Sequence, residues 1–243
     1  MMPVSLRFTF EQFRKEVDSM SRISRQFMDP GADWVFGKLL TNLRQIQATG
    51  RPGRWDAPEK SPLTTLPSGE YEPGGKTAFH VRGEMTWTWA LSPLHLRAKP
   101  KAVPDAFDVT GIASVSIRIR KATEGDTDVL AAWNIELGAV DSPGCYFHAH
   151  IGNNLCVPRL PSLFVTPMAA LEFLLGELFQ DRWAEHVSKE SGDVQFWRST
   201  QRDTFVRLLD WKKKKVEAGA GSPWIALKKA KPEAADGLFV SVK

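Results

Sequence analysis

Two histidines separated by a single residue are the side chains in this sequence that most suggest chemistry. His148 and His150 lie in the run Tyr-Phe-His-Ala-His at positions 146–150. In a β-strand, alternate side chains point to the same face, which places the two Cα atoms about 6.5–7 Å apart. Two imidazoles at that spacing can hold a divalent metal ion or contact a phosphate group. The spacing therefore predicts a catalytic or metal-binding site at His148 and His150.

A catalytic metal site needs at least a third protein ligand. Strand alternation offers His80, Glu84 and Glu136 for this role. With such a ligand, the protein is a metal-assisted or phosphate-directed hydrolase that contains a divalent metal. The structural alternative is that both histidines form hydrogen bonds within the fold or face water, and no cofactor is expected in that case.

Cys156, a few residues after the histidine pair, is a second candidate catalytic side chain. The expected order of elements around it is a helix, a four-stranded meander, a histidine-bearing strand, a cysteine loop and a helix. This order resembles ubiquitin-conjugating enzymes and their bacterial relatives. Leu155, Cys156, Val157 and Leu160 follow the local pattern of that family, but its His-Pro-Asn motif is absent at positions 150–153. The resemblance implies a reactive thiol, and the alternative is a buried structural cysteine.

Positive charge is concentrated in the last quarter of the chain. The segment Arg182–Lys243 has 13 Lys and Arg against 8 Asp and Glu, whereas the rest has 19 against 20. This asymmetry fits an acidic partner, such as nucleic acid or an anionic protein face. The side chains expected to make the contact are Arg198, Arg202, Lys212, Lys213, Lys214, Lys215, Lys228, Lys229 and Lys231. Lysines at a helix C-terminus also stabilise the helix dipole, which is the structural alternative for Lys212–Lys215.

Several well-known catalytic motifs do not occur in the sequence. It has no Gly-x-Ser-x-Gly elbow, no phosphate-binding Gly-rich loop, no dinucleotide fingerprint and no paired-cysteine zinc spacing. The leading hypothesis is therefore a non-catalytic binding or assembly subunit of a cytosolic complex. Its nine tryptophans favour a protein partner, and its basic C-terminal quarter favours contact with nucleic acid.

The expected fold class is α+β, with a helical hairpin, an antiparallel sheet and C-terminal helices. Apolar residues at three- and four-residue steps predict helices over Phe8–Met28, capped by Thr9, and over about Ala32–Gln47 with Trp34 inward. Period-two alternation predicts a four-stranded, mainly antiparallel meander. Its strands are Phe79–Leu91, Ile112–Arg120, Val129–Leu137 and Cys145–Ile151.

The period returns to 3.6 after Pro167, which predicts a helix containing Leu171–Phe179 and a last helix over about Asp193–Ala218. The apolar residues assigned to this last helix are Phe196, Trp197, Phe205, Leu208, Leu209 and Val216. The segments are thus a hairpin at 1–50, a loop or linker at 51–76, a sheet core at 77–165 and a helical part at 166–243, together forming one compact domain.

Apolar stretches fall far short of the roughly 20 residues that a membrane span requires. The two cysteines, Cys145 and Cys156, are expected to be reduced, and the first residues lack the features of a signal peptide. These observations predict a cytoplasmic protein that does not bind membranes.

Overall fold

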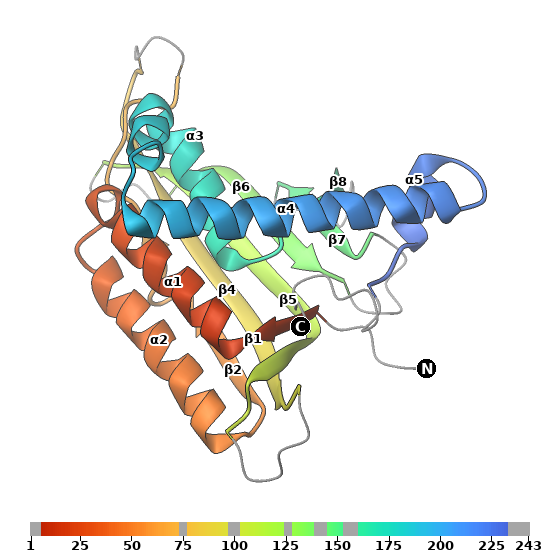
Figure 1. Ribbon diagram of the computed structural model, residues 1–243. Coiled ribbons are helices and arrows are strands. Elements are labelled where there is room, and N and C mark those ends of the chain that lie inside the picture. Colours follow the sequence, from red (N-terminus) through yellow and green to blue (C-terminus); the bar gives the residue numbers. More distant parts are fainter. Residues whose placement is uncertain are drawn as a thin grey trace.

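The structure is a computed structural model that describes residues 6–72, 77–96, 103–123, 128–138, 145–152 and 160–232. Helices and strands together make an α+β fold, as the sequence predicts (Figure 1). The elements are β1 (Leu6–Thr9), α1 (Phe10–Ser24), the 3-10 turn η1 (Arg25–Phe27), α2 (Ala32–Thr49), β2 (Gly53–Ala57), β3 (Leu63–Thr64), β4 (Val81–Leu94), β5 (Ala106–Lys121), β6 (Val129–Leu137), β7 (Phe147–Ile151), β8 (Leu160–Pro161), α3 (Pro167–Val187), α4 (Gly192–Ala218) and α5 (Pro223–Lys229).

The eight described strands form one antiparallel sheet. Its order is β2-β4-β5-β6-β7-β8, with β1 also paired to β5 and β3 to β4. Strands β4 to β7 are the predicted meander, but the prediction of four strands is wrong because the sheet is larger. Strands β1, β3 and β8 are too short to show alternation. Strand β2 lies in a segment rich in Gly and Pro that masks its period, and its backbone pairs with β4 from Gly53 to Ala57.

The segment 51–76 was expected to be a loop or linker, and this is wrong for its first part. Trp55 of β2 lies opposite Trp89 of β4 in the core, and its indole N–H donates to the backbone oxygen of Leu39 at 3.2 Å. Leu63 of β3 is also fully buried. Burial of these side chains, rather than local turn preference, fixes the backbone of this segment as sheet.

The helices cover one face of the sheet. In Figure 1, α1 and α2 lie side by side over β2 and β4, and α4 crosses above the central strands. Helix α3 packs on β4 and β5. Alternate side chains of the central strands point into this layer, among them Met85, Trp87 and Trp89 of β4. The other face of the sheet carries the intervening polar residues, such as Thr86 and Thr88 of β4, and none of the described helices packs on it.

The N-terminal hairpin follows the sequence prediction, with two differences. Residues Leu6–Thr9 pair with β5, so the helix begins at Phe10, where the hydroxyl of Thr9 accepts from the backbone N–H of Gln12 at 3.2 Å. The expected inward position of Trp34 is wrong. Its ring is exposed with the ammonium of Lys38 at 4.1 Å, because the buried stripe of α2 runs through Val35, Phe36, Leu39, Leu43 and Ile46.

The C-terminal helices begin at capping residues. The hydroxyl of Thr166 accepts from the backbone N–H of Ala169, and Pro167 occupies the first turn, as predicted. Two of the apolar residues that the sequence assigns to the last helix, Phe205 and Leu209, do not face the core. Both are exposed because they lie to the side of the buried stripe of α4, which comprises Val194, Trp197, Thr200, Leu208 and Trp211.

A close approach holds α3 against the sheet at Gly83 of β4. A Cβ atom at this position would lie 2.8 Å from Cδ1 of Leu174 and 3.0 Å from Cδ1 of Leu178. Only a residue without a side chain allows α3 to pack this near to the strand.

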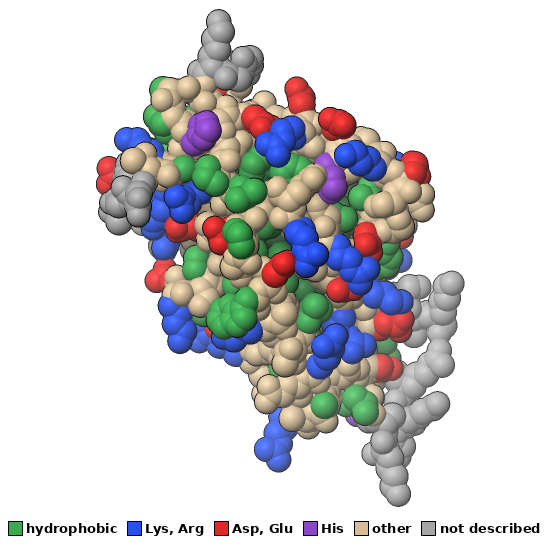
Figure 2. All heavy atoms as spheres, turned by 90° about the vertical axis from the view of Figure 1, so that its left-hand side faces the viewer, with side chains coloured by type: hydrophobic (Ala, Val, Ile, Leu, Met, Phe, Trp, Pro, Cys, Tyr) green, Lys and Arg blue, Asp and Glu red, His purple; other side chains and the backbone are tan. Residues whose placement is uncertain are grey.

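Among the described helices, none has the length and apolar content needed to cross a membrane. Acidic and basic side chains are interleaved on the side of the molecule shown in Figure 2, so that side presents no surface of a single charge sign.

Candidate metal centre

Strand pairing brings a carboxylate to the histidine pair. Glu136 of β6 lies directly opposite His148 of β7, and Asn134 lies opposite His150. The neighbouring pair, Leu137 with Phe147, points into the helix-covered core. Glu136, His148 and His150 therefore project together from the other face of the sheet.

The separations of the three side chains are those of ligands around one small cation. Oε2 of Glu136 lies 3.3 Å from Nε2 of His148 and 3.7 Å from Nε2 of His150. One ligand atom from each residue can be chosen so that all three lie within 4.8 Å of one another. Tetrahedral zinc with bonds of about 2.0–2.1 Å places its ligand atoms about 3.3–3.4 Å apart. The two separations from Glu136 are close to this spacing, and the three side chains can converge on one ion.

Burial restricts the two rings and leaves the carboxylate accessible. The side chains of His148 and His150 are 3% and 10% exposed, and that of Glu136 is 32% exposed. The rings are nearly perpendicular, at 82°, with centroids 4.9 Å apart. A solvent path to an ion between them would thus pass beside Glu136.

The second ring nitrogen of His148, Nδ1, differs from that of most metal-binding histidines. A histidine that binds a metal usually donates its other ring N–H to a carbonyl or carboxylate, which fixes the tautomer. Nδ1 of His148 is buried and has no hydrogen-bond partner among the described residues. Among the described residues, the Glu136 carboxylate is therefore the only ion-pair or hydrogen-bond partner of the His148 ring.

The two other proposed ligands lie elsewhere. Glu84 lies on β4, which β5 separates from β6. Its carboxylate accepts from Nε of Arg120 at 2.8 Å. His80 is exposed just before β4. Within the described ranges, Glu136, His148 and His150 are the one group of three or more His, Cys, Asp or Glu residues suited to a metal.

Cys156 lies outside the described residues, as do Leu155 and Val157, so the site implied by the resemblance to ubiquitin-conjugating enzymes stays a prediction. Leu160 is described and is exposed on β8. The other cysteine, Cys145, is a half-buried free thiol that precedes β7.

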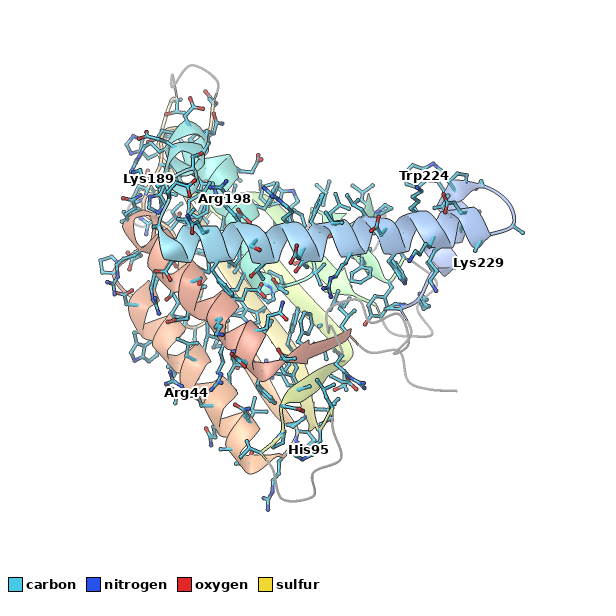
Figure 3. The ribbon with its side chains drawn as sticks, viewed as in Figure 1. Arg44, His95, Lys189, Arg198, Trp224 and Lys229 are labelled. Carbon is cyan, nitrogen blue, oxygen red and sulfur yellow. The ribbon has the colours of Figure 1, made fainter. Side chains whose placement is uncertain are left out.

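The basic residues of the C-terminal quarter do not gather in one patch. Figure 3 shows Arg198 near the start of α4 and Lys229 on α5, beyond its far end. A helix of 27 residues is about 40 Å long. Lys214, Lys228 and Lys229 are exposed, and Lys231 is half-buried.

Internal contacts engage several of these cations. Nζ of Lys212 donates to the backbone oxygen of Ser162 at 2.6 Å, and burial lowers its pKa. Arg198 lies 3.6 Å from a carboxylate oxygen of Glu190, and Lys213 lies 3.8 Å from one of Glu217. The ammonium of Lys215 lies 5.7 Å from the ring centroid of Trp211.

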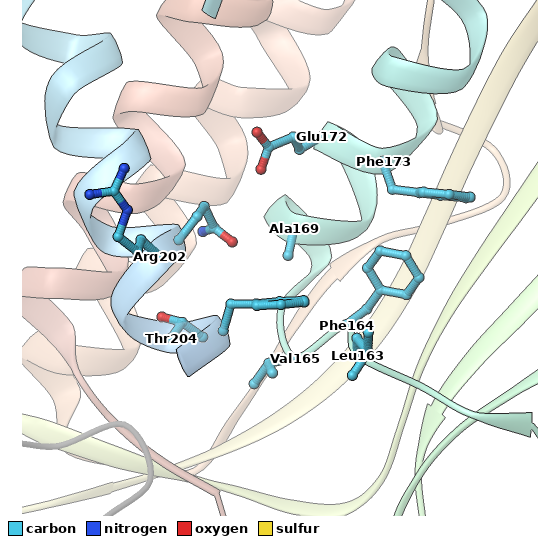
Figure 4. Close-up of a pocket in the computed structure, with 10 residues that line it drawn as sticks. Leu163, Phe164, Val165, Ala169, Glu172, Phe173, Arg202 and Thr204 are labelled. Carbon is cyan, nitrogen blue, oxygen red and sulfur yellow. The ribbon is translucent and has the colours of Figure 1, made fainter. Parts of the chain in front are cut away.

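Sequence reasoning did not find a pocket between α3 and α4. Its cavity volume is about 380 Å³, and Figure 4 shows Glu172 and Phe173 on one side with Arg202 and Thr204 on the other. Gln201 also lines it and contacts the buried carboxyl group of Glu16 on α1. One feature of the sequence points to this region: Glu16 is a charged residue within the apolar stripe of Phe13, Val17 and Met20.

Comparison of the chain with protein-family models, with curated proteins and with solved structures gives no match.

Proposed function

We propose that the protein is a metal-assisted hydrolase whose divalent ion is held by Glu136, His148 and His150. The observation that carries this proposal is the pairing of β6 with β7, which adds a carboxylate to a histidine pair at ligand spacing. Two histidines and one glutamate are a known donor set of catalytic zinc sites, in which the fourth position holds water.

Each residue has a distinct part in this proposal. His148 and His150 supply Nε2 donors from one strand, and their burial limits the orientations of both rings. Glu136 supplies the negative charge and lines the solvent path. A divalent ion in this position would lower the pKa of a bound water molecule and so supply a nucleophile near neutral pH.

Zinc titration of the purified full chain tests the site. We expect one Zn²⁺ per chain by isothermal titration calorimetry, with affinity falling at low pH because the imidazoles must be neutral to bind. The substitutions Glu136→Gln and His150→Gln should each weaken binding at least about tenfold, because each removes a ligand.

His80→Gln is the matched control, since it removes an exposed histidine outside the cluster. Equal zinc affinity in this control and in the ligand variants would overturn the metal site. Hydrolysis of activated phosphate and carboxylate esters, measured with the zinc-loaded protein, should be lost in Glu136→Gln and retained in His80→Gln. A zinc site without any such hydrolysis would remove the enzymatic part of the proposal.

A binding role for α4 and α5 is the second candidate function. Phe205, Val206 and Leu209 are exposed on α4, and Trp224 on α5 is 68% exposed. Aromatic and aliphatic side chains beside exposed cations favour contact with a protein partner or with nucleic acid. This arrangement supports the assembly-subunit hypothesis independently of the metal.

A salt series of fluorescence anisotropy with labelled DNA and RNA tests the nucleic-acid form of this role. Substitution of Lys213 and Lys214 by Ala should weaken binding and reduce its salt dependence, because exposed lysines release counterions from phosphate. Lys212→Ala is a poorer probe, since Lys212 is held by Ser162. An unchanged salt slope in the double variant would exclude phosphate contact by these lysines.

A further inference from the structure

The pocket between α3 and α4 is separate from the metal centre. It lies in the helical layer on one side of the sheet, whereas Glu136, His148 and His150 project from the other side. Its cavity volume of about 380 Å³ lies within the usual range for small-molecule sites. A ligand in this pocket would therefore not contact the proposed metal ligands.

Aromatic and aliphatic side chains form most of its wall. The rings of Phe164 and Phe173 meet at 54° with centroids 4.9 Å apart, and Phe205 lines the cavity from α4. Leu163 and Phe205 are both exposed despite their apolar character. Aromatic faces carry a negative quadrupole, so a cluster of rings attracts a cation as well as an apolar body.

A half-buried carboxyl group, Glu172, with the buried Glu16 behind it, gives the pocket its polarity. Glu172 lines the cavity, and burial raises its pKa, an effect that the indole of Trp197 partly offsets. Behind it, the Glu16 carboxylate accepts from the Thr166 hydroxyl at 2.6 Å and from Nε2 of Gln201 at 3.4 Å. Glu172 further raises the pKa of Glu16 by repulsion between like charges.

Neither carboxyl group has a basic partner among the described residues. Arg202 lines the same pocket, but it is exposed and forms no ion pair with either acid. An ionised carboxylate in such a site is costly unless a positive charge accompanies it. Both acids therefore stand without a positive partner in the described part of the chain, although Arg202 lies on the opposite wall.

We propose that the α3–α4 pocket binds a small organic cation, an ammonium or methylammonium group carried on an apolar body. The charged group would lie against the carboxylate of Glu172 and the aromatic faces of Phe164 and Phe173. The apolar body would extend along Leu163 and Phe205 toward solvent. Gln201 links this site to Glu16, because its side chain lines the cavity and donates to that carboxylate.

The probe is 2-phenylethylammonium, titrated into the full chain in the presence of a metal chelator and followed by calorimetry or ligand-observed NMR. We expect saturable binding that Glu172→Gln weakens about tenfold or more, because the charge-assisted contact is lost while the shape is kept. Glu177→Gln, an exposed acid on the same helix, is the matched control and should bind as the wild type does.

Three results would overturn the proposal. The first is the absence of saturable binding at millimolar concentrations of 2-phenylethylammonium. The second is equal affinity in Glu172→Gln and Glu177→Gln, with both variants folded by circular dichroism. The third is tighter binding of the anion 3-phenylpropionate than of the ammonium, which would identify Arg202 as the recognition residue. Because the chelator removes any metal, these results do not depend on the metal centre.

Discussion

The buried carboxyl group of Glu16 makes the stability of the fold dependent on pH. Glu16 lies on α1 beneath α3 and α4, is 4% exposed, and has a pKa raised to about 7 from the ordinary 4.5, chiefly by desolvation. Hydrogen bonds from Thr166 and Gln201 oppose this effect and do not cancel it. Among the described residues, Glu172 is the charged group that acts on it, in the same direction as burial.

The sign of the effect follows from proton binding. Between about pH 4.5 and 7 the unfolded chain has lost the Glu16 proton and the folded chain has kept it. The free energy of unfolding therefore falls as pH rises through this range, and it levels off above about pH 8. The two pKa values of 4.5 and about 7 correspond to a total loss of about 3 kcal/mol.

Replacement of Glu16 by Gln isolates this contribution. Gln keeps a carbonyl oxygen that can accept from Thr166 and Gln201, but it does not ionise. Urea unfolding of both proteins from pH 4.5 to 9 should show a stability difference that shifts in favour of Glu16→Gln by about 3 kcal/mol over the range. Glu11→Gln, an exposed position on the same helix, should leave a difference that varies little with pH.

Unfolding free energies of Glu16→Gln and wild type that run parallel across the pH range would contradict a raised pKa of Glu16 in the folded chain. A constant offset would mean that the Glu16 carboxyl group titrates alike in the folded and unfolded chains. If the stability difference between Glu11→Gln and wild type changed equally with pH, the cause would be the loss of any negative charge and not the burial of Glu16.

The remaining predictions concern packing and capping, and each can be measured by urea unfolding at pH 6. Gly83→Ala should destabilise the fold by about 1–3 kcal/mol, because its methyl group would collide with Leu174 and Leu178; a neutral result would show that α3 can shift. Thr166→Val should cost about 1–2 kcal/mol through loss of the α3 cap and of the hydrogen bond to Glu16, and an unchanged midpoint would contradict the capping role. Trp224→Ala should change stability by less than about 0.5 kcal/mol, since the ring is exposed; a larger loss would mean that α5 packs more firmly than its exposure indicates.

Local pattern sufficed for the elements whose period is long and uninterrupted. The alternation of Val129–Leu137 predicts β6 with its observed bounds, and Thr166 with Pro167 predicts the start of α3. Period-two alternation in Cys145–Ile151 likewise places His148 and His150 on one face of β7. These features depend on neighbouring residues along the chain, so the sequence carries them directly.

The rest depended on contacts between distant segments. Strand β2 forms because Trp55 is buried against Trp89. Phe205 is exposed because α4 buries a stripe through Trp197, Leu208 and Trp211 instead. Alternation offered His80, Glu84 and Glu136 equally as a third ligand, and the β6–β7 register brings only Glu136 to the histidines.

The fold class, the central meander and the paired imidazoles follow from periodicity within single elements, so the sequence predicts them. Contacts between distant segments bring the Glu136 carboxylate to those imidazoles and place Glu16, Glu172 and Gln201 beside a cavity. Register and helix crossing are set by burial of side chains far apart in the chain. Residue spacing within one element does not encode that burial.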